Sequence, residues 1–204
     1  MNYNLKMEQI IESIKKENKK PTLLLHVCCA PCSSACIERL DENFKITLFF
    51  YNPNITEQDE YIKRLNEVKR FVNEFKTTAK IEVIDGGYDS KIFFEMTKGL
   101  EESPEKGPRC YKCYKQRIKQ TAEVCKNKNF DYFTTSLSLS PYKVVTWINE
   151  IGEEVAKEYN VNFLNCDFKK KNGYKRSIEL SEKYKLYRQN YCGCIYSKQM
   201  SNKL

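Results

Sequence analysis

The sequence lacks several features that would assign it to a familiar class. It has no G-x-G-x-x-G and no G-x-x-x-x-G-K-[ST] segment, so a glycine loop that cradles phosphate is absent. No apolar run approaches the ~20 residues of a membrane-spanning helix. The N-terminal stretch MNYNLKMEQIIESIKKENKK is charged throughout and lacks the apolar centre of a signal peptide. We therefore expect a cytoplasmic protein with no membrane partner.

Positive charge is concentrated at the C-terminal end of the chain. The net charge is +8, and residues 169–204 account for all of it, with ten Lys or Arg against two acids. Five tyrosines are interleaved with these charges: Tyr174, Tyr184, Tyr187, Tyr191 and Tyr196. Such a segment could hold a phosphate backbone and stack bases. A solvated lysine-rich surface explains the same composition equally well.

Apolar runs that resemble buried strands alternate with stretches of helical periodicity. The predicted strands are 22–27, 45–51, 80–85, 131–137 and 161–165. Apolar residues recur at three- and four-residue steps in the predicted helices 61–75, 111–127 and 144–159. This alternation predicts an α/β fold, a Rossmann-like parallel sheet with helices on both faces.

The length of 204 residues suits a single catalytic domain, 1–204. Residues 1–20 are expected to be an N-terminal extension outside the core that carries the motifs. Residues 168–204 break the strand–helix alternation and are expected to form a basic C-terminal appendage.

In open α/β sheets, ligands bind beyond the carboxyl ends of the strands. Three cysteines follow the first predicted strand: Cys28, Cys29 and Cys32. Residues 52–55 follow the second strand, and residues 136–141 follow the fourth. The sequence therefore predicts a site built from these loops.

Ten cysteines in a reducing compartment favour metal or redox chemistry over structural disulfides. Cys110 and Cys113 form a C-x-x-C motif that should open a helix, where thiolates are stabilised. Together with Cys28 and Cys29 they could supply four thiolates. Because neighbouring side chains in a turn diverge, we expect a multi-metal cluster, [4Fe–4S], with zinc as the alternative. Cys32 is a further candidate ligand, or could contact a second metal.

The C-x-C motif of Cys192 and Cys194 differs from these pairs. A disulfide across it would be strained and easily reduced, and Gly193 supplies the backbone freedom that so small a ring needs. We interpret the pair as a redox-active dithiol near the site. Ligands of a second metal, or free thiols, are the alternatives.

Other residues near the motifs have ordinary as well as functional explanations. Three isolated cysteines are expected to fill the core: Cys36, Cys125 and Cys166. His26, the only histidine, should be structural. Asn52 and Asn54 should either grip a substrate or cap the following helix. Arg109 and Arg117 could bind phosphate or stabilise a cluster, although helix-surface arginines are the ordinary explanation.

Four motifs stand in the order and approximate spacing of a known family. HVCCAPC, YNPNI, CYKCY and YCGC resemble the QueH-type epoxyqueuosine reductases, over about residues 20–198. The resemblance implies a fold like that of the adenine-nucleotide α-hydrolase group. Because CCAPC occupies the place of that group's nucleotide loop, ATP binding is not expected.

The resemblance also implies a reaction and its residues. The family reduces epoxyqueuosine to queuosine at the wobble position of tRNA, removing the epoxide oxygen with two electrons. Four residues match its cluster cysteines: Cys28, Cys29, Cys110 and Cys113. Cys192 and Cys194 match its redox-active pair. A second, mononuclear iron is possible, with Cys32 as a possible ligand. tRNA and an unidentified electron donor are then the partners.

Two other functions compete with this one. A zinc-stapled RNA-binding module without catalysis would explain the basic segment and the cysteine pairs, but not the C-x-C motif. A thiol–disulfide oxidoreductase that uses Cys110 and Cys113 would need no metal. Colour separates the reductase from the zinc module, because an iron–sulfur protein purified without air is brown and a zinc protein is colourless.

Overall fold

The computed structural model of the protein describes residues 1–201, which form five strands in one sheet. Every strand pairs parallel to its neighbours, in the order β3-β2-β1-β4-β5. The strands are β1 (Thr22–His26), β2 (Lys45–Phe50), β3 (Glu82–Asp85), β4 (Tyr132–Thr135) and β5 (Asn162–Phe163). The predicted α/β class and parallel sheet are confirmed.

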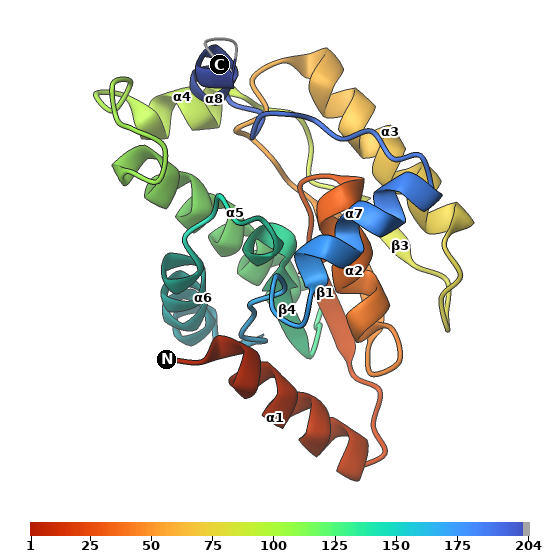
Figure 1. Ribbon diagram of the computed structural model, residues 1–204. Coiled ribbons are helices and arrows are strands. Elements are labelled where there is room, and N and C mark those ends of the chain that lie inside the picture. Colours follow the sequence, from red (N-terminus) through yellow and green to blue (C-terminus); the bar gives the residue numbers. More distant parts are fainter. Residues whose placement is uncertain (202–204) are drawn as a thin grey trace.

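Helices cover both faces of this sheet (Figure 1). The helices are α1 (Tyr3–Lys16), α2 (Ala30–Leu40), α3 (Gln58–Glu74), α4 (Lys91–Thr97), α5 (Pro108–Asn127), α6 (Val145–Tyr159), α7 (Gly173–Lys183) and α8 (Ile195–Ser201). A short 3₁₀ helix, η1, spans Ser136–Leu139. Helices α2, α3 and α7 pack together on one side, and α5 packs on α6 on the other. The central strand is thus buried on both faces, which explains its unbroken apolar run.

The central strand also marks the place where a ligand is expected. In β1, Leu24 pairs with Thr47 of β2 on one side and with Phe133 of β4 on the other. The chain moves outward from β1 to β2 and β3, and later returns to add β4 on the opposite edge. Such a reversal opens a crevice at the carboxyl ends of the two strands concerned. Here these strands are β1 and β4.

The predicted elements exist, but several boundaries differ from those expected. The fourth strand stops at Thr135, because the Thr135 Oγ1 accepts the Leu137 backbone N–H and the chain turns into η1. Helix α5 begins at Pro108 and not at residue 111. Proline is favoured in the first helical turn because its missing N–H is not needed there.

The N-terminal residues pack against the rest of the fold. Four side chains of α1 recur on one face and are buried: Tyr3, Met7, Ile11 and Ile14. Lys6 also pairs with Glu153 of α6, at 2.7 Å. Helix α1 thus contributes to the hydrophobic core, although it carries none of the motifs.

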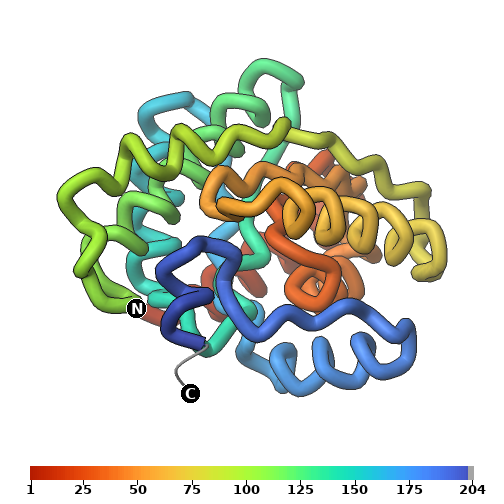
Figure 2. Tube along the Cα trace, turned by 90° about the horizontal axis from the view of Figure 1, so that it is seen from above, coloured from red at the N-terminus to blue at the C-terminus, as the bar shows by residue number. Residues whose placement is uncertain are grey.

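The C-terminal segment is not an appendage, and that expectation was wrong. Helix α7 packs on α2. Residues 184–194 then run along α3, where Arg70 binds the Tyr184 carbonyl at 3.0 Å and Glu67 accepts the Tyr187 N–H at 2.7 Å (Figure 2). The basic composition concealed the buried apolar anchors Leu180 and Leu186. The segment ends over the carboxyl edge of the sheet, beside the predicted site.

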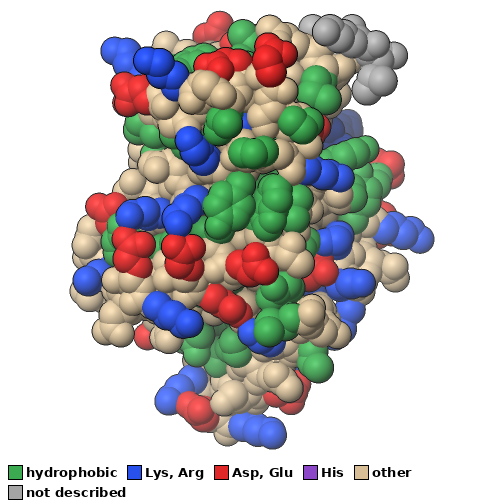
Figure 3. Space-filling view, turned by 90° about the vertical axis from the view of Figure 1, so that its left-hand side faces the viewer, with side chains coloured by type: hydrophobic (Ala, Val, Ile, Leu, Met, Phe, Trp, Pro, Cys, Tyr) green, Lys and Arg blue, Asp and Glu red, His purple; other side chains and the backbone are tan. Residues whose placement is uncertain are grey.

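Much of the basic excess is neutralised locally. Ion pairs within 4 Å join four of the C-terminal cations to acids: Lys169 to Asp167, Lys171 to Glu8, Arg176 to Glu38 and Glu179, and Lys198 to Glu57. On the face formed by α5 and α6, acidic and basic side chains are interspersed (Figure 3).

Within residues 1–201, no helix is long and apolar enough to cross a membrane.

Candidate active site

Three cysteine sulfurs converge after β1. The Sγ atoms of Cys28, Cys29 and Cys32 all lie within 4.8 Å of one another, and those of Cys28 and Cys29 are 3.8 Å apart. Cys29 is the N-cap of α2, and its sulfur accepts the Cys32 backbone N–H at 3.4 Å. The expectation that the adjacent pair diverges was wrong, because the capping geometry turns Cys29 back over the first turn of the helix.

The three thiols of this triplet, residues 28, 29 and 32, do not ionise alike. Contacts with Cys29 and Cys32, together with the charge of Arg117, hold the pKa of Cys28 well below its usual range. Burial raises the pKa of Cys29 to about 12. Contacts with the other two thiols, and burial, raise the pKa of Cys32. Cys28 is therefore the member that ionises most readily, and a metal bound by all three would displace the protons that remain on the thiols.

The C-x-x-C motif lies in the first two turns of α5, as predicted. Gly107 is the N-cap of this helix, and Pro108 occupies its first position. Cys110 is half-buried, whereas Cys113 is buried, and burial raises the pKa of the Cys113 thiol. The Arg117 Nη1 donates to the Cys113 Sγ at 3.6 Å.

The two arginines that flank the motif are not on the surface. Arg117 is fully buried, and the negative charges of Cys113, Cys28 and Cys192 outweigh the effect of burial and raise its pKa. Arg109 is 3% exposed and donates to the carbonyls of Leu100 and Glu101, at 3.0 and 2.7 Å. Arg109 thus anchors the preceding loop, whereas Arg117 is the cation on which the thiol motifs converge.

The C-x-C motif lies in the loop that precedes α8. The Lys143 Nζ donates to the Cys192 Sγ at 3.0 Å. Burial alone would raise the pKa of Cys192, but the charges of Lys143 and Arg117 prevail and lower it. Burial, and then the charge on Cys192, raise the pKa of Cys194 to about 12. The pair is therefore asymmetric, and Cys192 ionises more readily than Cys194.

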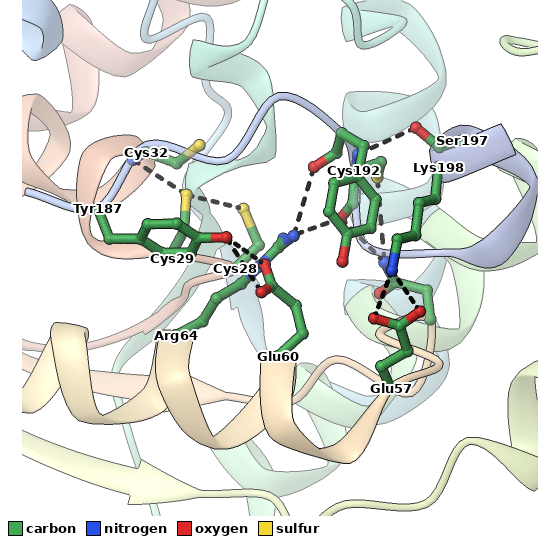
Figure 4. Close-up of polar contacts among 12 residues, drawn as sticks. Cys28, Cys29, Cys32, Glu57, Glu60, Arg64, Tyr187, Cys192, Ser197 and Lys198 are labelled. Atoms are coloured by element: carbon green, nitrogen blue, oxygen red, sulfur yellow. Dashed lines mark hydrogen bonds and ion pairs between the residues drawn. The ribbon is translucent and has the colours of Figure 1, made fainter. Parts of the chain in front are cut away.

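A buried ion pair on α3 holds this loop (Figure 4). Arg64, 1% exposed, pairs with Glu60 at 2.6 Å and donates to the carbonyls of Cys192 and Tyr191, at 3.1 and 3.4 Å. The Tyr187 hydroxyl donates to Glu60 at 3.1 Å. Arg64 was not among the residues predicted for the site. Its signal was a charged residue next to Leu65, on the apolar face of a predicted helix and four residues after an acid.

Gly193 is required at the centre of the same loop. Its φ is +119°, a conformation that side chains rarely adopt, and an added Cβ would lie 2.9 Å from the Ile55 Cγ1. Its carbonyl accepts the Thr56 N–H at 3.2 Å. The backbone freedom expected of this glycine thus allows the loop to pack closely against the segment that follows β2.

Two cavities adjoin at Cys192 and Lys143, which line both. The smaller, about 20 Å³, brings together four sulfur-bearing residues: Cys110, Cys113, Cys192 and Cys194. The larger, about 490 Å³, is bordered by Cys28, Cys32 and Arg117. Its volume is in the range of small-molecule sites. The predicted loops after β1 and β4, the C-x-x-C motif and the C-x-C motif therefore meet in one region.

The polar residues close to β1 and β2 have different roles. The His26 Nε2 donates to the Tyr51 carbonyl at 3.0 Å, and its Nδ1 accepts from the Thr135 hydroxyl at 2.8 Å. Burial, with the charge of Arg117, lowers the pKa of His26 to about 3. Its contacts agree with the structural role expected. Asn52 donates to the Val27 carbonyl at 2.9 Å.

Asn54 faces the site. Its Nδ2 lies 3.4 Å from the Cys192 carbonyl oxygen, and the residue lines the smaller cavity. Helix α3 starts at Gln58 with Glu57 as its N-cap, so neither Asn52 nor Asn54 caps it. The capping explanation was wrong. The side-chain oxygens of both asparagines are buried and have no hydrogen-bond partner among residues 1–201.

The three isolated cysteines line neither cavity. Each is buried in the hydrophobic core: Cys36, Cys125 and Cys166. Their sulfurs contact backbone carbonyls, those of Cys32, Phe130 and Thr135 respectively. They were expected to fill the core, and that is where they lie.

The donor set of the site is suited to a thiophilic metal centre. Every candidate ligand is a sulfur, which fits iron–sulfur clusters and zinc and disfavours magnesium or calcium. The three sulfurs of the triplet lie within 4.8 Å of one another, and Cys110 and Cys113 lie outside this group. Buried Arg117 would offset part of the negative charge that several thiolates carry. The residues could thus hold a metal, whose type depends on which sulfurs take part.

Comparisons with known proteins agree with this arrangement. The family model "Epoxyqueuosine reductase QueH" matches residues 23–200. The chain is 42% identical over 202 residues to the epoxyqueuosine reductase QueH of Streptococcus pyogenes serotype M1, covering 98% of this chain and 79% of that protein. The corresponding protein of Staphylococcus epidermidis is 40% identical, covering 97% and 84%. That of Thermotoga maritima is 33% identical, covering 86% and 90%.

Proposed function

The chain belongs to the QueH family of epoxyqueuosine reductases, and we propose that it converts epoxyqueuosine to queuosine at the tRNA wobble position. It is an oxidoreductase of tRNA queuosine synthesis. The proposed reaction is the two-electron removal of the epoxide oxygen. The observation that carries this proposal is the buried Arg117, which contacts the Cys113 sulfur and lines the same cavity as Cys28 and Cys192.

We propose that a [4Fe–4S] cluster is the cofactor, held by Cys28, Cys29, Cys110 and Cys113. The sulfur-only donor set and the neighbouring guanidinium support it. Cys32 is the possible ligand of a second, mononuclear iron, and its closeness to Cys28 and Cys29 favours a role in metal binding. When bound, this centre would polarise the epoxide and would pass the two electrons of the dithiol to it one at a time.

In this proposal the C-x-C pair supplies the two electrons of the reduction. Loss of the epoxide oxygen breaks two C–O bonds and forms a C=C bond. It consumes two electrons and two protons and releases water. Oxidation of the dithiol to a disulfide yields two electrons and, with Cys192 ionised, the proton of Cys194. Lys143, whose Nζ lies 3.0 Å from the Cys192 Sγ, stabilises the ionised Cys192, and the second proton comes from water.

The larger cavity is the proposed site of the modified base. Its rim carries Tyr142, Tyr174 and Tyr191, whose rings can stack on a base, and Arg188, which can pair with a phosphate. Cys192 is among the residues that line this cavity, so a base that enters it would lie near the reactive sulfur. Lys170 and Lys175, which form no ion pair within residues 1–201, would then bind the tRNA backbone.

Other expectations remain part of the proposal. The strand order and the cysteine loop after β1 support a relationship to the adenine-nucleotide α-hydrolase group without ATP binding. We treat residues 1–204 as one catalytic domain of a cytoplasmic enzyme. An external electron donor must re-reduce the dithiol. Family membership favours the reductase over a zinc-stapled RNA-binding module or a general thiol–disulfide oxidoreductase.

The decisive experiment uses anaerobically purified protein. Iron, acid-labile sulfide and the absorption spectrum are measured, and the protein is then incubated with epoxyqueuosine-containing tRNA and a reductant. We expect a brown protein and a product nucleoside that has lost one oxygen atom. A colourless zinc protein that binds the tRNA and leaves the nucleoside unchanged would contradict the proposal.

A further inference from the structure

A buried lysine stands beside only one sulfur of the C-x-C pair. The side chain of Lys143 is 8% exposed, and its Nζ lies 3.0 Å from the Cys192 Sγ. A buried ammonium is costly unless an anion faces it. The other groups facing it are the Glu105 carboxylate, at 3.9 Å, and the Tyr114 ring, whose centroid is 5.9 Å away. Because 3.9 Å is too long for a hydrogen bond, Cys192 is the closest anionic partner.

The second sulfur of the pair has a different environment. The Cys194 Sγ accepts the backbone N–H of Ser197 at 3.4 Å and lines only the smaller of the two cavities. One N–H dipole stabilises a thiolate far less than an ammonium in contact with it. The two sulfurs, with one residue between them, therefore differ strongly in how well a thiolate is stabilised. The difference comes from Lys143, on the loop after β4.

The other cations near the pair make different contacts. Arg64 of α3 binds the carbonyl oxygen of Cys192 and not its sulfur. Arg117 of α5 donates to the Cys113 sulfur and acts on Cys192 only through its charge. The remaining charged neighbour, the thiolate of Cys28, repels negative charge on Cys192. Among residues 1–201, Lys143 is thus the cation that is hydrogen-bonded to this sulfur.

We propose that Lys143 is a positioning residue that holds Cys192 as the anionic sulfur of the pair and thereby makes the oxidised pair easy to reduce. This rests on the proposed redox role of Cys192 and Cys194. On reduction by an external dithiol, the S–S bond breaks and takes up two electrons. Cys192 leaves as a thiolate beside Lys143, and Cys194 takes one proton. A cation that stabilises the reduced form shifts the equilibrium toward it.

The test is a redox equilibrium on the anaerobic holoenzyme. Wild type, Lys143→Met, Lys143→Gln and Lys143→Arg are equilibrated with mixtures of reduced and oxidised dithiothreitol at neutral pH. Free thiols are then blocked with iodoacetamide, and mass spectrometry of the peptide carrying both cysteines gives the oxidised fraction. Lys128→Met is the matched control, because Lys128 is exposed at the far end of α5. Iron content confirms that each variant is folded and loaded.

We expect loss of the charge in the Met and Gln variants to favour the disulfide about tenfold, a potential about 30 mV more negative. The Arg variant and the Lys128 control should stay close to wild type. The rate at which iodoacetamide alkylates Cys192 should fall in the Met and Gln variants, while that of Cys194 should not. Unchanged equilibria and unchanged Cys192 alkylation in iron-loaded Met and Gln variants would overturn the proposal.

The same experiment separates this inference from the proposed function. If wild type never forms the Cys192–Cys194 disulfide at any dithiothreitol ratio, the dithiol role fails. The alkylation rates still report whether Lys143 ionises Cys192. If the disulfide forms but Lys143→Met does not move its equilibrium, the dithiol role stands and the role of Lys143 is refuted.

Discussion

Replacing Gly193 by alanine should damage the site through one methyl group. Two costs follow from the structure. A side chain at φ +119° is strained, which typically costs about 1–3 kcal/mol. The new Cβ would also stand 2.9 Å from the Ile55 Cγ1 and 3.3 Å from the Arg64 Nη1, and overpacking of this kind typically costs another 1–3 kcal/mol or so. To relieve the contact, either these side chains or the loop that carries Cys192 must move.

Gly87→Ala is the matched control for this variant. Gly87 also has a positive φ, +85°, but an added Cβ would meet nothing within 4 Å. The two variants therefore share the backbone strain and differ in the steric contact. In a protein of this size, about 1 kcal/mol corresponds to about 2–4 °C in the unfolding midpoint.

The assay combines thermal unfolding of the anaerobic holoenzyme with turnover of epoxyqueuosine-containing tRNA. Gly193→Ala should unfold several degrees below Gly87→Ala and should lose most of its turnover, while keeping its iron. Gly87→Ala should keep its activity. Equal midpoints together with full turnover in Gly193→Ala would refute the idea that the loop must fit tightly against Ile55 and Arg64.

Three further predictions concern the cofactor, the dithiol and tRNA. Alanine at any proposed cluster ligand should lower iron and sulfide content and abolish turnover, and a full cluster in all four ligand variants would refute the assignment. The control variants Cys36→Ala, Cys125→Ala and Cys166→Ala should keep the cluster and lose about 1 kcal/mol or more of unfolding free energy. The double variant Cys192→Ser, Cys194→Ser should keep its iron and lose multiple turnover, and full steady-state activity would remove the pair from the mechanism. tRNA affinity should fall with salt by a log–log slope of about −0.7 to −0.9 per phosphate neutralised. Lys170 and Lys175 form no ion pair within residues 1–201, and reversing their charges to Glu should weaken tRNA binding without changing iron content. Binding that does not depend on salt would show that these lysines are solvated surface residues without a role in tRNA binding.

The sequence by itself determined the layers of the fold and the general location of the site. The unbroken run Leu23–Leu24–Leu25 could only be a strand buried on both faces, and strand–helix alternation then dictated a parallel sheet. The carboxyl ends of such strands lie at one edge of the sheet. For that reason the loop with Cys28 and the loops after the second and fourth strands could be expected to meet before any coordinates were known, whereas Cys192 was expected there because of its interpretation as a redox pair.

Only the tertiary structure decided which charges act on the thiols. Arg64, Arg117 and Lys143 look like ordinary surface residues in the sequence, because a charged side chain gives no local sign that it is buried. Their burial depends on elements that are distant along the chain, above all on the C-terminal segment, which its composition made look like an appendage. Local pattern fixes what a residue can do, but the charge state of a thiol depends on which cation lies within a few ångströms. At Cys192 that cation is Lys143, 49 positions away in the chain.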